Sequence, residues 1–236
     1  MYEITQPEID VFNNQVKFEV FDRDFIIYVN RICTPISKLN LPRIAFNVCA
    51  VTILTGDKIE GDIIEIGVWA GGGVLSMIKT LEKYNDTNRQ VHLYDTFEGM
   101  TQPDDIDTDY QGNSAKNLMD SNPDFWKCAC DIDTVKSNIE KNTDYPKGNI
   151  KYHKGDILKN KFIPDKIALL RLDTDWYEST KHELETFFPK VVKGGIVIVD
   201  DYGHFNGAKK AVNEFLLQHP ELKIYQIDYT GIFFIK

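Results

Sequence analysis

The sequence predicts an α/β protein with a Rossmann-like, doubly wound sheet that is mostly parallel. Short β-rich runs alternate with longer helical stretches from residue 62 onward, which is typical of βαβ units. The runs IALLRL and GIVIV are apolar without alternation, as in central strands that are buried on both faces. Two β-rich runs separated by two residues close the chain, and they predict an antiparallel hairpin at the sheet edge.

The expected elements follow in order along the chain. Strands are predicted at residues 62–67, 91–95, 150–156, 167–173, 195–201, 223–228 and 231–235, and helices at 72–83, 179–188 and 208–218. The first 60 residues have helical character, interrupted by Pro35 and Pro42, and no strand pattern. We therefore expect an N-terminal helical lid layer at residues 1–60 and one sheet-based domain at residues 61–236.

Composition limits the classes of partner. The chain has 236 residues, 42% of them hydrophobic, and a formal net charge of −9, which argues against nucleic acid or an anionic membrane as the main partner. No run of ~18 apolar residues predicts a membrane span, and the acidic N-terminus has no signal-peptide core. The four cysteines form no Cys-x-x-Cys pair, so we expect free thiols and a cytoplasmic protein with a small-molecule substrate. The sequence leaves the oligomeric state open and is compatible with a homo-oligomer.

A glycine-rich turn joins the first predicted strand to the next helix. Residues 65–73 read EIGVWAGGG, in which Gly67 and Gly71 let the backbone turn tightly and approach a ligand. Trp69 stands where the dinucleotide fingerprint has its second glycine, which disfavours a pyrophosphate. A ligand without phosphates, such as S-adenosylmethionine, fits better, and Glu65 could meet its ammonium group directly or through water. The alternative is a tight turn that binds nothing.

Two more acids and a long loop follow strand ends, where open α/β sheets bind ligands. Asp95 could accept hydrogen bonds from ribose hydroxyls, and Asp156 could face adenine. Each could instead cap a helix, and Asp95 could simply be solvated in its loop. Residues 100–130 are polar, acidic and rich in turn-forming residues, so we expect this loop to have a functional role, and the alternative is a loop that is simply mobile.

Three carboxylates end the two apolar strands. They are Asp173, Asp200 and Asp201, and Arg171 is the one charge within those apolar runs. Because parallel neighbours end on the same side of a sheet, the three carboxylates should converge, and such crowding calls for a cation. Oxygen ligands suit a hard ion such as Mg²⁺, which would lower the pKa of a substrate hydroxyl. The alternative is that these residues cap the two following helices.

Three residues near this cluster are candidates for the general base. Asp173 is one, and Asp175 could either take a proton or cap the helix that begins near residue 179. His204 could be the base, contact the substrate, or be an ordinary surface-loop residue. The sequence does not choose among them.

Four segments together resemble the macrocin O-methyltransferase family, whose members methylate sugar hydroxyls of macrolide and aminocoumarin antibiotics. The segments are GDIIEIGVWAGGGVLSM at 61–77, YDTFEGM at 94–100, LLRLDTDWYEST at 169–180, and GGIVIVDDYG with GAKKAVNEF at 194–215. The resemblance implies a methyltransferase domain at 61–236, S-adenosylmethionine as methyl donor and a Mg²⁺-type metal. It implies a metal role for Asp173, Asp200 and Asp201, and cofactor contacts for Glu65, Gly67 and Asp95.

The acceptor does not follow from the resemblance, because residues 1–60 and 100–130 depart from the antibiotic enzymes. We expect a metal-dependent O-methyltransferase that acts on a hydroxyl of a sugar or glycoside. The sugar could belong to a surface polysaccharide, a nucleotide-linked sugar or a natural product. The alternatives are an O-methyltransferase for a non-sugar vicinal diol such as a catechol, a nicotinamide-dependent dehydrogenase, and a cofactor-binding scaffold without activity.

Overall fold

The predicted mostly parallel sheet is present. In the computed structural model, which describes residues 2–236, seven strands lie in the order β3-β2-β1-β4-β5-β7-β6. Strands β1 to β5 are parallel, and β7 is antiparallel to both β5 and β6, so the expected edge hairpin is confirmed. The strands are β1 (Asp62–Ile66), β2 (Val91–Asp95), β3 (Ile150–Lys154), β4 (Ile167–Leu172), β5 (Val191–Val199), β6 (Tyr225–Gln226) and β7 (Ile232–Ile235).

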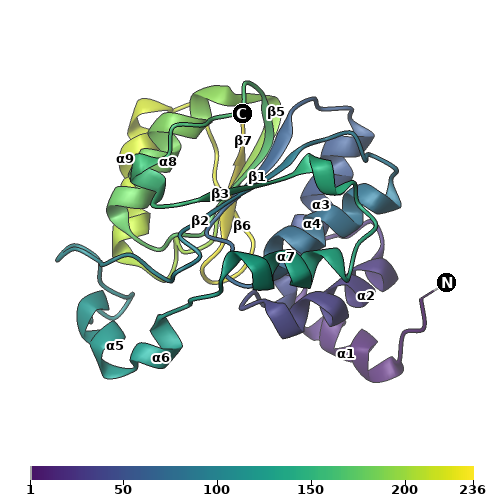
Figure 1. Ribbon diagram of the computed structural model, residues 1–236, viewed down its shortest axis with the longest axis horizontal. Coiled ribbons are helices and arrows are strands. Elements are labelled where there is room, and N and C mark those ends of the chain that lie inside the picture. Colours follow the sequence, from purple (N-terminus) through teal and green to yellow (C-terminus); the bar gives the residue numbers. More distant parts are fainter. Residues whose placement is uncertain (1) are drawn as a thin grey trace.

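Helices cover both faces of the sheet (Figure 1). On one face lie α3 (Leu41–Gly56), α4 (Gly72–Lys83) and α7 (Ile132–Glu140), and on the other lie α8 (Tyr177–Phe187) and α9 (Asn206–Gln218). The strand order turns at the boundary between β1 and β4, and doubly wound sheets bind ligands at the carboxyl ends of such strands.

Successive residues of the central strands serve the two faces in turn. Ile63, Leu169 and Ile196 belong to the core that includes α3 and α4. Their immediate neighbours belong to the second core, with α8 and α9; they are Ile64, Leu170 and Val197. This double burial explains why the sequence of these strands is continuously apolar.

The first 60 residues are helical, as expected. They form α1 (Gln6–Gln15), α2 (Arg23–Cys33), a short 3₁₀ turn (Thr34–Ile36) and α3. The prolines sit where they are tolerated, Pro35 in the 3₁₀ turn and Pro42 in the first turn of α3, which the side chain of Asn40 caps. Helix α3 packs on the sheet through residues such as Phe46 and Leu54, whereas α1 and α2 pack mainly against other residues of the N-terminal region.

The structure corrects the predicted extents of several elements. The 100–130 segment contains two short helices, α5 (Ala115–Ser121) and α6 (Pro123–Trp126), which lie away from the sheet in Figure 1. Strand β3 stops at Lys154 because Gly155 has a φ of 141° and the side chain of Asp156 caps the next turn. Within residues 2–236, no helix has the length and apolar character required to cross a bilayer.

Candidate active site

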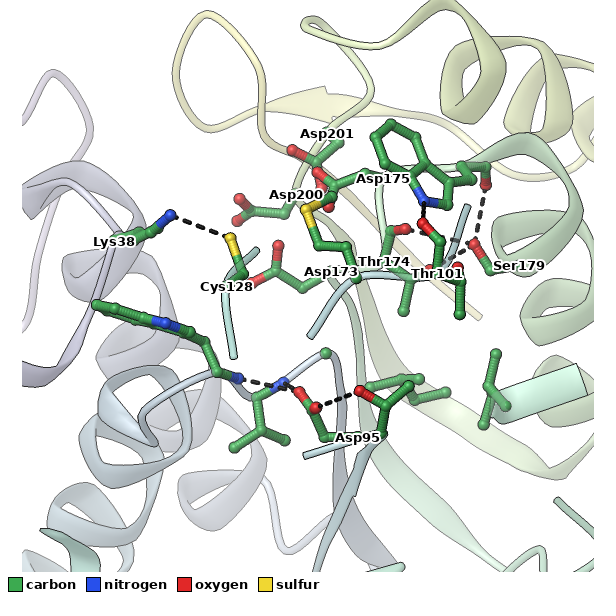
Figure 2. Close-up of a pocket in the computed structure, with 18 of the residues that line it drawn as sticks. Lys38, Asp95, Thr101, Cys128, Asp173, Thr174, Asp175, Ser179, Asp200 and Asp201 are labelled. Carbon is green, nitrogen blue, oxygen red and sulfur yellow. Dashed lines mark hydrogen bonds between the residues drawn. The ribbon is translucent and has the colours of Figure 1, made fainter. Parts of the chain in front are cut away.

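A cavity of about 500 Å³ opens at the carboxyl ends of β1, β2, β4 and β5. Ten of the eleven residues singled out by the sequence line it, together with residues 36–39 of the N-terminal region and parts of the 100–130 segment. The eleventh, Gly71, is the N-cap of α4 and is not among the lining residues. The candidate site residues are therefore gathered in one place (Figure 2).

The glycine turn is built as the sequence predicts. Gly67 has a φ of 85°, and a β-carbon there would overlap the backbone carbonyl of Asp173, so the ends of β1 and β4 touch at this point. Gly71 has a φ of 96°, a conformation that favours glycine. Trp69 takes a left-handed φ of 46° and lines the cavity.

Asp95 anchors this turn. Its Oδ2 accepts hydrogen bonds from the backbone N–H of Val68 (2.7 Å) and of Trp69 (3.0 Å), and its Oδ1 accepts one from Phe97 (2.7 Å). Neither helix capping nor simple solvation describes this residue. A carboxylate has about four acceptor sites, so ribose binding by the remaining lone pairs stays a prediction.

Asp156 caps the short 3₁₀ helix at Ile157–Lys159, which was the alternative to a contact with adenine. Its Oδ1 accepts a hydrogen bond from the backbone N–H of Leu158 at 3.0 Å, and its Oδ2 pairs with Lys159 at 3.1 Å. It also lines the cavity, so a contact with adenine remains a prediction.

Glu65 is 1% exposed and lies at the cavity wall. Its Oε1 pairs with Nε of Arg171 at 3.2 Å, and its Oε2 is buried without a hydrogen-bond partner. Burial raises the pKa of Glu65 to about 7, although the Arg171 charge acts in the opposite direction. An unsatisfied buried carboxylate oxygen is costly, and a ligand ammonium group would satisfy it.

The three predicted metal ligands converge. Asp173, Asp200 and Asp201 each offer a carboxylate oxygen, and these oxygens lie within 4.8 Å of one another. The helix-cap alternative is wrong for this cluster. The N-caps of α8 and α9 are Trp176 and Phe205, and neither helix has a side-chain cap hydrogen bond from its N-cap residue.

Two arginines meet this cluster, and sequence reasoning assigned no role to either. Arg171 Nη2 lies 2.5 Å from Asp200 Oδ1 and 3.1 Å from Asp173 Oδ2. Arg43 of α3 pairs with Asp200 Oδ2 and, at 3.3 Å, with Asp228. Arg171 was visible as a charge inside an apolar strand, whereas nothing local marked Arg43.

Asp175 and Asp201 complete the acidic floor. Asp175 has a φ of 68°, an uncommon backbone conformation for a residue with a side chain. Asp201 Oδ2 is buried without a hydrogen-bond partner. Burial raises the pKa of both carboxyl groups, and the negative charge of Asp200 adds to this effect.

His204 lies on the cavity wall and is not a simple surface-loop residue. Its Nδ1 is 3.1 Å from the hydroxyl of Tyr229, and its ring packs edge-on against Phe205. Burial lowers the pKa of His204, which favours the neutral imidazole near pH 7.

Two further contacts join segments that line the cavity. Lys38 Nζ lies 3.0 Å from the backbone carbonyl of Phe125 and 3.0 Å from Cys128 Sγ, so it joins the N-terminal region to the end of α6. From the 100–130 segment, Asp107 Oδ1 accepts a hydrogen bond from the first N–H of α8, at Tyr177 (2.8 Å). The sequence identified the two regions but neither residue.

The sequence is similar to known enzymes over most of its length. Residues 41–236 match the family model described as Macrocin-O-methyltransferase (TylF). Demethyldecarbamoylnovobiocin O-methyltransferase of Streptomyces niveus is 33% identical over 182 residues, which cover 75% of this chain and 67% of the relative. The 8-demethyl-8-(2,3-dimethoxy-alpha-L-rhamnosyl)-tetracenomycin-C 4'-O-methyltransferase of Streptomyces olivaceus is 32% identical over 189 residues, 78% of this chain and 69% of the relative.

Solved structures agree with the fold. The O-methyltransferase NovP superposes with a TM-score of 0.74 at 26% identity, covering 85% of this chain and 82% of NovP. The calicheamicin methyltransferase CalS11 superposes with a TM-score of 0.65 at 16% identity, covering 95% of this chain and 96% of CalS11, which supports the fold alone. These matches contradict the dehydrogenase alternative. The chain belongs to the macrocin-O-methyltransferase family and has the fold of the S-adenosylmethionine-dependent O-methyltransferases.

Proposed function

We propose that this protein is a metal-dependent O-methyltransferase that moves a methyl group from S-adenosylmethionine to a hydroxyl of a sugar or glycoside. The observation that carries the proposal is the convergence of Asp173, Asp200 and Asp201 on the floor of the same cavity as the glycine turn. The named substrates of the relatives support the acceptor class, since one acts on a rhamnosyl group and another is a mycinamicin III 3''-O-methyltransferase.

The residues present fit a hard divalent cation. All the donors are carboxylate oxygens, and Asp201 brings a buried oxygen that has no partner. The two arginines leave Asp201 and Asp175 without a basic partner among the ion pairs of residues 2–236. When bound, a cation such as Mg²⁺ would supply a Lewis acid that lowers the pKa of an acceptor hydroxyl.

Asp175 is the residue that we assign as general base. It lines the cavity beside the metal ligands and has no arginine partner, whereas Asp173 is held by Arg171. Its left-handed backbone is a cost that is typical of residues held in place for function. Burial raises the pKa of Asp175 toward the range that suits a proton acceptor at neutral pH. His204, turned toward Tyr229, would contact the acceptor.

The cofactor would lie along the glycine turn. Glu65 would offer its unpartnered Oε2 to the ammonium group, Asp95 would accept from ribose with its remaining lone pairs, and Asp156 would lie at the adenine end. Trp69, whose backbone Asp95 holds, would cover the cofactor from the N-terminal side. With these assignments the sulfonium methyl group would lie near the acidic floor, where an acceptor hydroxyl would be oriented and deprotonated.

The acceptor would occupy the opposite half of the cavity. The cavity lining includes aromatic side chains that suit the apolar faces of a sugar ring; they are Phe125, Trp126, Trp176, Phe205 and Tyr229. Residues 36–39 and the 100–130 segment border the mouth and meet through Lys38. We propose that the N-terminal layer and this segment act together as the lid that excludes water.

A panel of glycosides and nucleotide-linked sugars tests the proposal. The protein is incubated with S-adenosylmethionine and Mg²⁺, and mass spectrometry reports any product heavier by one methyl group. We expect a methylated glycoside, and we expect Asp175→Asn to lower its rate by about 100-fold or more, the scale of a lost general base. Methylation of catechols with none of the sugars would contradict the acceptor class, and an unimpaired Asp175→Asn would contradict the base.

A further inference from the structure

A charged row crosses the sheet just before the strands reach the cavity. Glu65 of β1 and Arg171 of β4 are paired in register, and they follow Ile63 and Leu169 on the face that α3 and α4 cover. Two residues after Arg171 on the same strand comes Asp173. On this face of the sheet, the side chains therefore change from apolar at Ile63 and Leu169 to charged at Glu65 and Arg171, two residues further along each strand.

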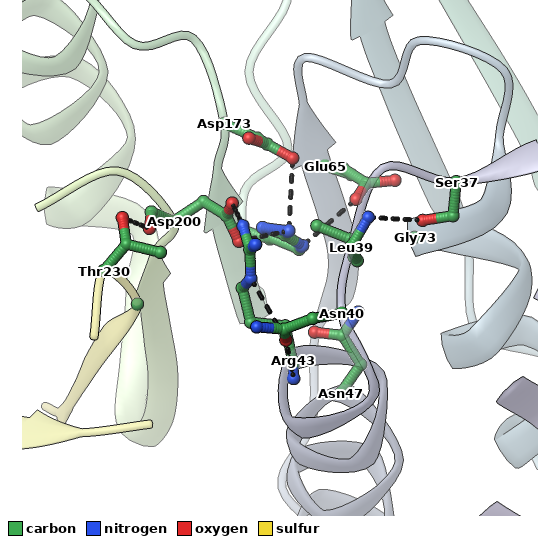
Figure 3. A network of polar contacts seen from close by, with 12 residues as sticks. Ser37, Leu39, Asn40, Arg43, Asn47, Glu65, Gly73, Asp173, Asp200 and Thr230 are labelled. Carbon is green, nitrogen blue, oxygen red and sulfur yellow. Dashed lines mark hydrogen bonds and ion pairs between the residues drawn. The ribbon is translucent and has the colours of Figure 1, made fainter. Parts of the chain in front are cut away.

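Arg171 is the largest of the fully buried side chains, with 0% of its surface exposed. Its guanidinium touches carboxylates that follow or belong to three neighbouring strands: Nε lies 3.2 Å from Glu65, and Nη2 lies 3.1 Å from Asp173 and 2.5 Å from Asp200. Figure 3 shows the three acids, Glu65, Asp173 and Asp200, around the same part of this polar network. Arg171 is not among the residues that line the cavity, so it lies behind the acids that do.

Stability alone does not account for this arrangement. Taking an arginine and its partners out of water carries a large desolvation penalty, and an apolar residue of similar volume often stabilises a core as well or better. Arg171 Nη1 and Nε are both buried without a hydrogen-bond partner, so the Nε contact with Glu65 is an ion pair alone and the site is not optimised for hydrogen bonding. The guanidinium instead offers a rigid, planar fork that fixes where several carboxylates point.

We propose that Arg171 is a positioning residue shared by the two halves of the active site: it orients Glu65 toward the cofactor and Asp173 and Asp200 toward the metal. This inference rests on the proposed function, because it uses the assigned roles of those three acids. A fork that holds both groups keeps the cofactor end and the metal end at a fixed separation. That separation decides whether the acceptor oxygen and the methyl group meet at reacting distance.

Arg171→Lys tests the inference, because it keeps the charge and removes the fork. Two affinities are measured well below the unfolding temperature: S-adenosylhomocysteine by calorimetry without metal, and Mn²⁺ by electron paramagnetic resonance without cofactor. We expect each to weaken by about tenfold, the lower end of what lost outer-shell partners cost a metal site. A merely structural role would lower the unfolding temperature and leave both affinities of the folded protein unchanged.

Arg43→Lys is the matched control. Arg43 contacts Asp200 but not Glu65, so this variant should weaken Mn²⁺ binding and leave S-adenosylhomocysteine binding as in the wild type. The inference fails if Arg171→Lys retains either affinity, or if Arg43→Lys weakens the cofactor analogue equally. A wild type that binds S-adenosylhomocysteine but no Mn²⁺ would overturn the proposed metal site itself, and this inference with it. The two failures are thus distinguishable.

Discussion

Gly73→Ala should destabilise the protein by pushing on Glu65. Gly73 lies in the first turn of α4, and a β-carbon there would sit less than 3.0 Å from Glu65 Oε1 and 3.2 Å from Oε2. The Glu65 side chain cannot move out into solvent, because it is 1% exposed and its Oε1 is paired with Arg171. The carboxylate must therefore shift within the core and loosen that pair.

The magnitude follows from two opposing effects. Alanine in place of a helical glycine stabilises by about 0.5–1 kcal/mol, whereas breaking a buried ion pair costs about 3–5 kcal/mol. We expect a net loss of about 2–4 kcal/mol. At ~2–4 °C per kcal/mol for a chain of this length, the melting temperature should fall by about 4–16 °C.

Urea and thermal unfolding, followed by circular dichroism, measure this loss. Gly56→Ala is the matched control, because Gly56 ends α3 and nothing lies within 4 Å of its β-carbon position, so its stability should stay level or rise slightly. In a Glu65→Ala background, Gly73→Ala should lower the free energy of unfolding much less, because the carboxylate that its β-carbon would overlap is absent. A Gly73→Ala protein as stable as the wild type would refute the reasoning.

Three further outcomes are expected. S-adenosylhomocysteine at ~100 times its dissociation constant should stabilise the wild type by roughly 2.7 kcal/mol in thermal unfolding. Asp95→Ala should lose most of that stabilisation, because it removes both the ribose acceptor and the hydrogen bonds that hold the turn at Val68 and Trp69. The absence of any shift in the wild type would contradict the cofactor assignment. Lys38→Ala, which severs the contacts with Phe125 and Cys128, should raise the acceptor KM and spare S-adenosylhomocysteine affinity; an unchanged KM would count against the lid. Burial lowers the pKa of His153 to about 4, so between pH 6.5 and 4 the unfolded chain binds a proton at this residue and the folded chain does not. As the pH is lowered through this range, the free energy of unfolding should therefore decrease more steeply in the wild type than in His153→Phe. Parallel curves from chemical unfolding would refute this.

The sequence predicted the sheet well because its signals are local. The apolar runs of β4 and β5 and the glycine turn at Gly67 each specify an element within a few residues. The extents were less certain: β6 has only two residues, Tyr225 and Gln226, because edge pairing depends on a partner strand that sequence patterns do not show.

The sequence identified most of the residues that form the site, but not the contacts that join them. Parallel strands bring Asp173 beside Asp200 by topology, so their convergence could be inferred. The roles of Arg43 and Lys38 could not, because each reaches its partner across more than 80 residues of sequence. Asp95 shows the same limit: a strand-end acid predicts a ligand contact, and only the fold reveals that it also holds Val68 and Trp69.

The central claim is that Asp173, Asp200 and Asp201 hold a cation on which methyl transfer depends. The most direct test measures the methylation rate of an accepted glycoside in excess chelator and again after Mg²⁺ is restored. The account predicts that activity stops and returns, and that Asp201→Asn, which alters the unpartnered ligand with little change in shape, lowers the rate at least ~10-fold, the scale of roughly 1.4 kcal/mol. Full activity in chelator, with Asp201→Asn unimpaired, would contradict it.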